Sequence, residues 1–313
     1  MVTPMRVKAR SFGPVATLAL HEGVIAHVIA VFDRCFYLQT KDHVVCVADS
    51  SLYDGPINLL VSRANHTPSW SNLGVAVGQG WRMEAGSLEP VSRSRLSINL
   101  CSSVLWKPPP LRGDPPRQEH VKAGLVQLKR MLLSWHRPDG LLGLVLGRQA
   151  SPIGAVERAA AKPLQELGEI TLFWLRNGHP GIKTSLYQLI GLGPGLTPSG
   201  DDLIAGLLIA ARYLGRAEAA STLWSELRPT AINQTNKISF AHLSASGQGF
   251  GAAPLHSLLA SMIENRDDRM TESLDAVARI GHSSGFDAVA GALILFDAWV
   301  GLSDRQSAVA RVC

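Results

Sequence analysis

Two short segments of the sequence carry serine, glycine and aspartate at the same spacing. Ser199-Gly-Asp-Asp-Leu-Ile-Ala-Gly206 and Ser284-Gly-Phe-Asp-Ala-Val-Ala-Gly291 share the pattern S-G-x-D-x-x-A-G. Hydroxyl and carboxylate groups at the start of a helix can hold a cation or a substrate amine, and the backbone N–H groups there can hold an anion. We therefore treat the two S-G-x-D segments as a structural pair and as the first candidate for a binding site.

The same spacing also has a purely structural interpretation. A serine followed three residues later by an acidic residue, just before an apolar run, is typical of a capping box at a helix N-terminus. Such a cap contributes about 1 kcal/mol. Capping does not require the glycine that follows each serine, Gly200 and Gly285. A glycine there lets backbone or a ligand approach closely.

The runs that follow the two segments are apolar on nearly all sides, which predicts two buried central helices. Gly206 and Gly291 could let these helices cross closely, or could be core glycines that are merely tolerated. A close crossing would gather Asp201, Asp202 and Asp287 in one cavity. Around them would lie the hydroxyl groups of Thr197, Ser199, Ser283 and Ser284. Such carboxylates cannot all stay ionised without a metal ion such as Mg²⁺, a nearby Lys or Arg, or a raised pKa.

Other residues near these segments are weaker candidates. The glycine-rich loop with Gly193 and Gly195 supplies N–H groups for an anion, but it is neither a Walker loop nor a dinucleotide fingerprint. Lys237 could neutralise the acids or bind an anion, or it could simply be solvated. His282 is placed for acid–base chemistry near neutral pH, or for a hydrogen bond within a loop.

At these residues the sequence resembles a known family. The run Gly193-Pro-Gly-Leu-Thr-Pro-Ser-Gly-Asp-Asp202, followed by Ala205-Gly206, and the Ser-Ser-Gly-x-Asp-x-x-x-Gly run from Ser283 to Gly291 are similar to the AllH-type subunit of bacterial oxamate carbamoyltransferase. The resemblance covers roughly residues 180–300. It is looser at Thr235 to Ser239, where a helix opening with threonine and serine is expected.

The resemblance implies transfer of a carbamoyl group between phosphate and oxamate in anaerobic purine (allantoin) breakdown, by a complex of several different subunits. It therefore implies a subunit that needs partner subunits. The Ser-Thr-Arg-Thr run by which aspartate and ornithine carbamoyltransferases grip carbamoyl phosphate is absent from this sequence. Carbamoyl transfer would therefore use a different site.

The first hypothesis is a site for phosphate or carbamoyl phosphate, a small anionic substrate. N–H groups from Gly195 to Gly200 and at Gly285 would hold phosphate, with Ser199 and Ser284 capping and donating. Asp201, Asp202 and Asp287 would bind a cation or the substrate amine. One alternative is a Mg²⁺-dependent hydrolase or phosphotransferase that uses the aspartate cluster. Another is a non-catalytic subunit that binds a metabolite.

Composition limits the class of protein. The chain has 313 residues, of which 46% are hydrophobic and 18% charged, and a net charge of +5 without a basic run. These values predict a globular protein in the cytoplasm, with no nucleic-acid partner and no membrane span. The four cysteines form no pair at metal-ligand spacing, so we expect them to be reduced.

The order of patterns predicts an α+β protein with two domains. Short β-branched runs up to residue 107 predict an antiparallel β domain, with strands at VATLAL, GVIAHVIAVF, CFYLQT, HVVCVAD, INLLV and LGVAVG. Residues 108–118 form a proline-rich linker. Helical periodicity over 119–313 predicts a mainly α-helical domain, with Pro163 kinking or breaking one helix.

Overall fold

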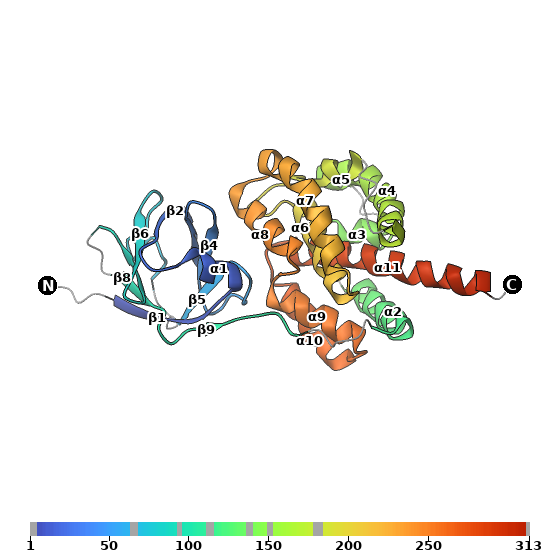
Figure 1. Cartoon of the computed structure of the whole chain (residues 1–313), viewed down its shortest axis with the longest axis horizontal. Helices are drawn as coiled ribbons and strands as arrows, with labels where there is room; N and C mark the ends of the chain where they lie inside the picture. Colours follow the sequence, from blue (N-terminus) through green and yellow to red (C-terminus); the bar gives the residue numbers. More distant parts are fainter. Residues whose placement is uncertain are drawn as a thin grey trace. The chain divides into compact units, whose positions relative to one another are not determined.

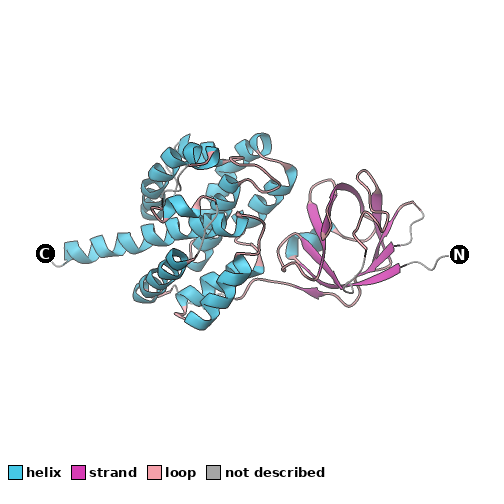
Figure 2. Cartoon of the chain, turned by 180° about the vertical axis from the view of Figure 1, so that it is seen from behind, coloured by secondary structure: helices cyan, strands magenta, loops and turns pink. Residues whose placement is uncertain are grey.

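The computed structural model describes residues 5–62, 68–92, 96–110, 116–135, 140–148, 153–177 and 184–310. The chain divides into two compact units, Met1–Pro108 and Pro109–Cys313 (Figure 1). All the strands described belong to the first unit, and all the helices except one short one belong to the second (Figure 2). The chain is thus an α+β protein, as expected. Residues 111–115 of the predicted linker lie outside the described residues.

The first unit is a closed β-barrel. Its strands are β1 (Met5–Phe12), β2 (Ile25–Val31), β3 (Cys35–Gln39), β4 (Val44–Asp49), β5 (Asn58–Ser62), β6 (Gly80–Glu84), β7 (Ser87–Pro90), β8 (Leu96–Asn99) and β9 (Val104–Leu105). Their order is β5-β4-β3-β2-β6-β7-β8-β1-β9, and a further pairing of β5 with β1 closes the ring. Inside, the ring of Phe36 packs against Trp70 and Trp81, with centroids 4.9 and 5.2 Å away.

The barrel is mixed, so the prediction of an antiparallel domain is corrected. β1 runs parallel to both β8 and β9, and β4 runs parallel to β5. The other pairings described are antiparallel. Parallel neighbours cannot be joined by a tight hairpin. The barrel therefore depends on pairings between segments that are distant in sequence.

Two of the predicted strands are not strands. The run VATLAL forms the helix α1 (Pro14–Ala19), which begins with proline and buries Ala16 and Ala19. The N–H groups of Val15 and Ala16 donate to the carbonyl of Pro56. The run LGVAVG, residues 73–78, forms turns whose two glycines have positive φ angles. In both runs local turn and helix chemistry outweighs β-branched composition.

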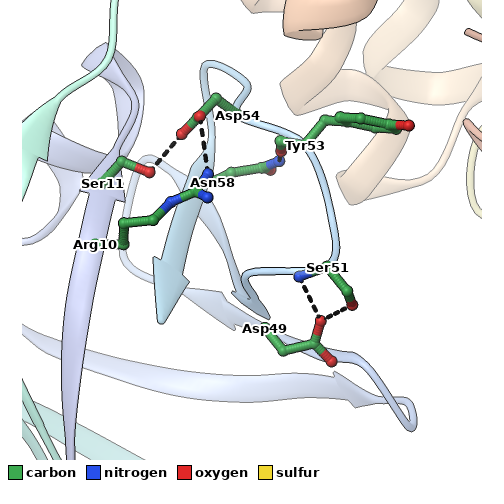
Figure 3. Close-up of polar contacts among 7 residues, drawn as sticks. All are labelled: Arg10, Ser11, Asp49, Ser51, Tyr53, Asp54 and Asn58. Atoms are coloured by element: carbon green, nitrogen blue, oxygen red, sulfur yellow. Dashed lines mark hydrogen bonds and ion pairs between the residues drawn. The ribbon is translucent and has the colours of Figure 1, made fainter. Parts of the chain in front are cut away.

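The connection between the parallel strands β4 and β5 is fixed to the barrel by polar contacts (Figure 3). The carboxylate of Asp54 accepts hydrogen bonds from the Ser11 hydroxyl and from the Arg10 guanidinium, the latter at 3.1 Å. Asn58 Nδ2 donates to the carbonyl of Tyr53 at 2.8 Å. Parallel strands cannot be joined by a hairpin turn, and these contacts fix the longer loop that joins them.

In the second unit every element of regular secondary structure among the described residues is a helix. Its helices are α2 (Gln118–Ser134), α3 (Leu142–Val145), α4 (Ala155–Asn177), α5 (Thr184–Leu189), α6 (Ser199–Tyr213), α7 (Ala217–Gln234), α8 (Lys237–Gly247), α9 (Ala253–Ile263), α10 (Asp267–Val277) and α11 (Ser284–Ala310). The helical periodicity found over residues 119–313 predicted helices in this part of the chain. Helix α4 runs on through Pro163, so this proline does not end it.

Helices α6 and α11 cross in close backbone contact. A Cβ atom added to Gly206 of α6 would lie 1.8 Å from the carbonyl oxygen of Ala288. One added to Gly291 of α11 would lie 1.8 Å from the carbonyl oxygen of Leu203. The two glycines therefore occupy reciprocal places at one crossing, where only hydrogen fits between the backbones. Nearly every residue of α6 is buried.

Helix α11 is also the most apolar long helix described. Its segment Ser284–Leu302 has a mean hydropathy of 1.6 and is by length and composition long enough to cross a membrane. Within the helical unit, however, 67% of that segment is buried. A core helix has this same combination of apolar composition and burial.

Candidate functional site

The crossing of α6 and α11 brings the two S-G-x-D segments together. Ser199 and Ser284 are the first residues of their helices, so Asp202 and Asp287 both lie one turn inside them. The hydroxyl of Thr197, in the loop before α6, lies 2.9 Å from the hydroxyl of Ser284. We call this meeting point of the two helix N-termini the α6–α11 junction.

Helix α6 does not begin with the predicted capping box. Its N-cap is Pro198, and no side chain caps the helix. In α11 the backbone carbonyl of Ser283 accepts the hydrogen bond from the N–H of Asp287. The hydroxyl of Ser284 lies within hydrogen-bond distance of the hydroxyl of Thr197, in the loop before the other helix. The shared S-G-x-D spacing thus serves the junction between the helices.

The glycine after each first serine is required by close backbone packing. A Cβ atom on Gly200 would lie 1.9 Å from the carbonyl oxygen of Leu189, at the end of α5. One on Gly285 would lie 2.1 Å from the carbonyl oxygen of Val277, at the end of α10. In both cases the preceding helix ends against the glycine. The sequence suggested that each glycine lets either backbone or a ligand approach closely, and the structure shows backbone at both positions.

These packing contacts also occupy two of the predicted phosphate donors. The N–H of Gly200 donates to the carbonyl of Leu192 at 2.9 Å, and that of Gly285 donates to the carbonyl of Ile280 at 3.2 Å. Neither N–H is left for an anion, which corrects the first hypothesis at these two positions. The loop around Gly195 is exposed, so its N–H groups remain accessible.

Asp201 serves the framework of the site. Its Oδ1 accepts a hydrogen bond from the N–H of Gly191 at 2.7 Å. Its Oδ2 accepts hydrogen bonds from the hydroxyls of Thr235 and Ser239, the latter at 2.6 Å. The side chain is buried, and both oxygens are used within the chain. Asp201 therefore ties the start of α8 to the loop before α6.

Asp287 is fully buried and only partly satisfied. Its Oδ1 accepts a hydrogen bond from the N–H of Leu141 at 2.6 Å. Its Oδ2 has no hydrogen-bond partner among the described residues. Burial raises the pKa of Asp287 to about 6, even though Leu141 N–H and the hydroxyls of Ser283 and Ser199 act to lower it. A carboxyl group in this state changes protonation close to neutral pH.

Asp202 faces the junction from the other helix. Burial raises the pKa of Asp202 well above its ordinary value, the hydroxyls of Ser284 and Thr197 lower it, and the charges of Asp287 and Asp201 raise it further. Its Oδ2 is buried and has no hydrogen-bond partner in the described parts of the chain. The serine that begins each helix thus lies near the aspartate of the other helix.

The three aspartates do not together form a metal site. Over the residues that the structure describes, no group of three His, Cys, Asp or Glu side chains could hold a metal ion. Asp201 is turned toward Thr235 and Ser239 and away from such a role. Burial raises the pKa of both Asp202 and Asp287, which is one of the three ways foreseen to accommodate several carboxylates.

The remaining candidates lie at the edge of the junction. His282 is exposed in the turn before α11, and Lys237 is exposed as the first residue of α8. Gly193 has a φ of 120° and lies against Ser199, where a Cβ atom would be 2.8 Å from the Ser199 nitrogen. Gly193 therefore shapes the loop, while the roles foreseen for Lys237 and His282 stay predictions.

Sequence reasoning missed the partners that hold the two acids in place. Leu141 follows Gly140, whose added Cβ atom would lie 2.2 Å from Asp287 Oδ1, and no pattern in the sequence marks this pair. Thr235 and Ser239 lie in the segment that the family resemblance singles out. Their hydroxyls hold Asp201, whereas attention in the sequence fell on Lys237 between them.

Comparison with known proteins agrees with the resemblance seen in the sequence. No solved structure matches the chain. A family model matches residues 189–296, from the end of α5 into α11. This stretch contains both S-G-x-D segments, the start of α8 and the helix crossing. Over these residues the chain matches the family of the oxamate carbamoyltransferase subunit AllH.

Proposed function

We propose that the chain is one subunit of a carbamoyltransferase of the oxamate type, and that the α6–α11 junction binds the amino end of its small substrate. The observation that carries this proposal is a pair of buried carboxyl oxygens, Asp202 Oδ2 and Asp287 Oδ2, neither of which has a hydrogen-bond partner among the described residues. Buried polar atoms are normally satisfied, so an unsatisfied pair favours a site for a group that donates hydrogen bonds.

The chemistry of the pair selects the kind of group that binds. A carboxylate oxygen only accepts hydrogen bonds, and a carbamoyl or oxamate group ends in an NH₂ that only donates. In their ionised forms the two unpartnered carboxylate oxygens, one on each helix, can accept the two hydrogens of one NH₂ group. A negatively charged group would be repelled here once Asp202 or Asp287 ionises.

The anionic end of such a substrate has a different partner. The exposed glycine-rich loop around Gly195 lies directly before α6, and its N–H groups and the Thr197 hydroxyl can donate to a carboxylate or a phosphate. In this arrangement the carboxyl pair orients the amino end and the loop holds the charge. The chemistry of transfer itself is shared with partner subunits, and the setting is nitrogen catabolism in the cytoplasm.

Titration calorimetry of the full chain with oxamate, carbamoyl phosphate and inorganic phosphate tests this function. We expect oxamate or carbamoyl phosphate to bind, and Asp202→Asn and Asp287→Asn each to weaken binding by about ten- to a hundredfold. Asn places an NH₂ group against the NH₂ of the ligand. Asp297→Asn, ten residues further along α11 and 43% exposed, is the matched control.

The proposal fails if both junction variants bind as the unmodified chain does. It also fails if none of the three compounds binds. Binding of inorganic phosphate that both variants keep would instead place an anion on the loop alone, without a role for the carboxyl pair. Far-UV circular dichroism of each variant checks that the helical unit is intact.

A further inference from the structure

A second hollow lies on the helical unit, further along α11 than the junction. It has a volume of about 550 Å³ and lies between α3, α4 and α11. Ile294, which lines it, follows Asp287 by two turns of helix, roughly 10 Å along the axis. Cavities that bind small molecules have volumes in this range. We call it the α4–α11 pocket.

The wall of the pocket is largely apolar, and a small residue in α4 leaves part of its space open. Leu144 and Val145 of α3, Leu164 of α4 and Ile294 of α11 line it. Gly168, one turn beyond Leu164 on the same face of α4, also lines it, and a Cβ atom added there would meet nothing within 4 Å. At this position α4 therefore leaves open space beside the pocket.

Two arginines lie at the same pocket. Arg148 Nη1 donates to the carbonyl of Trp135 at 3.3 Å, and Arg158 Nη1 donates to the carbonyl of Ile153. In the described part of the chain neither guanidinium has a carboxylate within ion-pair distance. A guanidinium has five N–H donors, so each keeps most of its donors for another partner.

The acidic residues of the pocket do not cancel this charge. Asp297 is already paired with Lys129, whose Nζ lies 2.6 and 2.7 Å from its two carboxylate oxygens. Glu157 folds back over Gly154, where a Cβ atom would be 2.1 Å from its Oε2. Among the described residues that line the pocket, there are thus two guanidinium groups without an ion-pair partner and one carboxylate, that of Glu157, without a cationic partner. The pocket favours an anion.

We propose that the α4–α11 pocket, further along α11 than the junction, is a second binding site, for a small carboxylate with an apolar body. The carboxylate lies against the guanidinium groups of Arg148 and Arg158, which match its planar geometry. The hydrocarbon part covers the apolar wall around Leu164 and Ile294. A neutral molecule of the same shape gains the apolar contact but not the charged hydrogen bonds.

Calorimetry of the full chain with hexanoate and hexanamide tests the site, since the two probes share an apolar body and differ in charge. We expect hexanoate to bind at least about tenfold more tightly than hexanamide. Combining Arg148→Gln with Arg158→Gln should remove this difference. Arg266→Gln, an exposed arginine paired with Asp268, is the control and should leave it unchanged.

A second variant tests the apolar part without touching a charge. Gly168→Leu fills the hollow with a good helix former and should abolish hexanoate binding while the helical circular dichroism is kept. Hexanoate binding that survives Gly168→Leu or the arginine pair overturns the proposal, as does equal binding of hexanamide or no binding of hexanoate. Oxamate binding at the junction should be unaffected by Gly168→Leu, so the two sites can be judged separately.

Discussion

At the scale of single residues, the junction contains two acidic side chains whose burial costs free energy when they are ionised. Asp287 is fully buried and its Oδ2 lacks a partner among the described residues. Leaving a carboxylate unsatisfied in a buried place costs free energy that a well-packed neutral residue would not cost. This cost should make the stability of the helical unit depend on pH.

We predict that Asp287→Asn makes the helical unit more stable at pH 8 and less sensitive to pH. The pKa of Asp287 is raised to about 6, so between about pH 4 and pH 6 the folded state binds more protons than the unfolded state. Stability is then present below the unfolded pKa and is lost as the pH rises through the folded pKa. The full loss, from below pH 4 to well above pH 6, amounts to about 3 kcal/mol, and about 1.4 kcal/mol of it falls between pH 5 and pH 8.

Urea unfolding followed at 222 nm, at pH 5 and at pH 8, measures this effect. Asn keeps an oxygen to accept the Leu141 N–H and cannot ionise, so the difference between the two pH values should shrink. Asp297→Asn on the same helix is the control and should keep the difference seen in the unmodified chain. A variant as sensitive to pH as the unmodified chain would contradict the raised pKa of Asp287.

The sequence brought Asp201, Asp202 and Asp287 into view together, and it also carries a difference between them. The two S-G-x-D segments share Asp202 and Asp287, whereas Asp201 stands where the other segment has Phe286. Successive residues of a helix point about 100° apart, so Asp201 and Asp202 cannot face the same partner. That difference marks Asp201 as the framework residue. Its partners on α8 were visible only in the structure.

At the scale of elements, the crossing of α6 and α11 positions everything else in the junction. It depends on two glycines that lie against the opposite backbone, Gly206 against Ala288 and Gly291 against Leu203. The spacing of these glycines from the S-G-x-D ends could be read from the sequence. The distance between the helices could not be predicted, because a glycine within a helix can also occur where no neighbouring backbone packs against it.

We predict that Gly206→Ala and Gly291→Ala each destabilise the helical unit by about 1–3 kcal/mol or more. Each new Cβ atom meets a backbone oxygen at 1.8 Å, and backbone cannot move aside as a flexible side chain can. Gly301→Ala lies on α11 in open space and should instead stabilise by up to about 1 kcal/mol. Urea midpoints of the three variants decide this.

The comparison within one helix makes the result specific. Gly291 and Gly301 have the same intrinsic preference against helix, so only the contact with α6 distinguishes them. Equal effects of the two alanines, in either direction, would mean that the helices do not touch at Gly291. A loss of oxamate binding that accompanies Gly291→Ala would further tie the junction to this crossing.

At the scale of the whole molecule, the two units differ in how far sequence could foresee them. Helices repeat apolar residues locally, so most helices of the second unit follow from periodicity. Strands β2, β3, β4 and β5 were found from their composition. The parallel pairing of β1 with β8 joins residues about ninety positions apart, and local patterns carry no signal for it.

Each unit has a hydrophobic core of its own. The barrel core contains Phe36, Trp70 and Trp81, and the helical core contains residues of α2 through α11, with no residue in common. The chain also divides at Pro108, within the run of prolines. A domain with its own closed core can fold alone. The units should therefore be separable.

We predict that Met1–Pro108 and Pro109–Cys313, produced separately, each fold cooperatively. The barrel unit should give a β-type far-UV spectrum with near-UV signals from Trp70 and Trp81, which are fully buried. The helical unit should give a helical spectrum and bind oxamate and hexanoate as the full chain does, because both sites lie within it. Circular dichroism with thermal melting and the same calorimetry measure both.

A fragment of residues 1–79 is the matched control for the barrel. It keeps β1 to β5 but lacks β6 to β9, so β1 loses β8 and the ring cannot close. Open edges left in this way expose backbone groups that a closed barrel satisfies, and the fragment should not melt cooperatively. If it folds as well as Met1–Pro108 does, closure through β1 is not what stabilises the unit. If the helical unit folds but binds neither compound, the two sites require the barrel, and the assignment of both to Pro109–Cys313 alone is wrong.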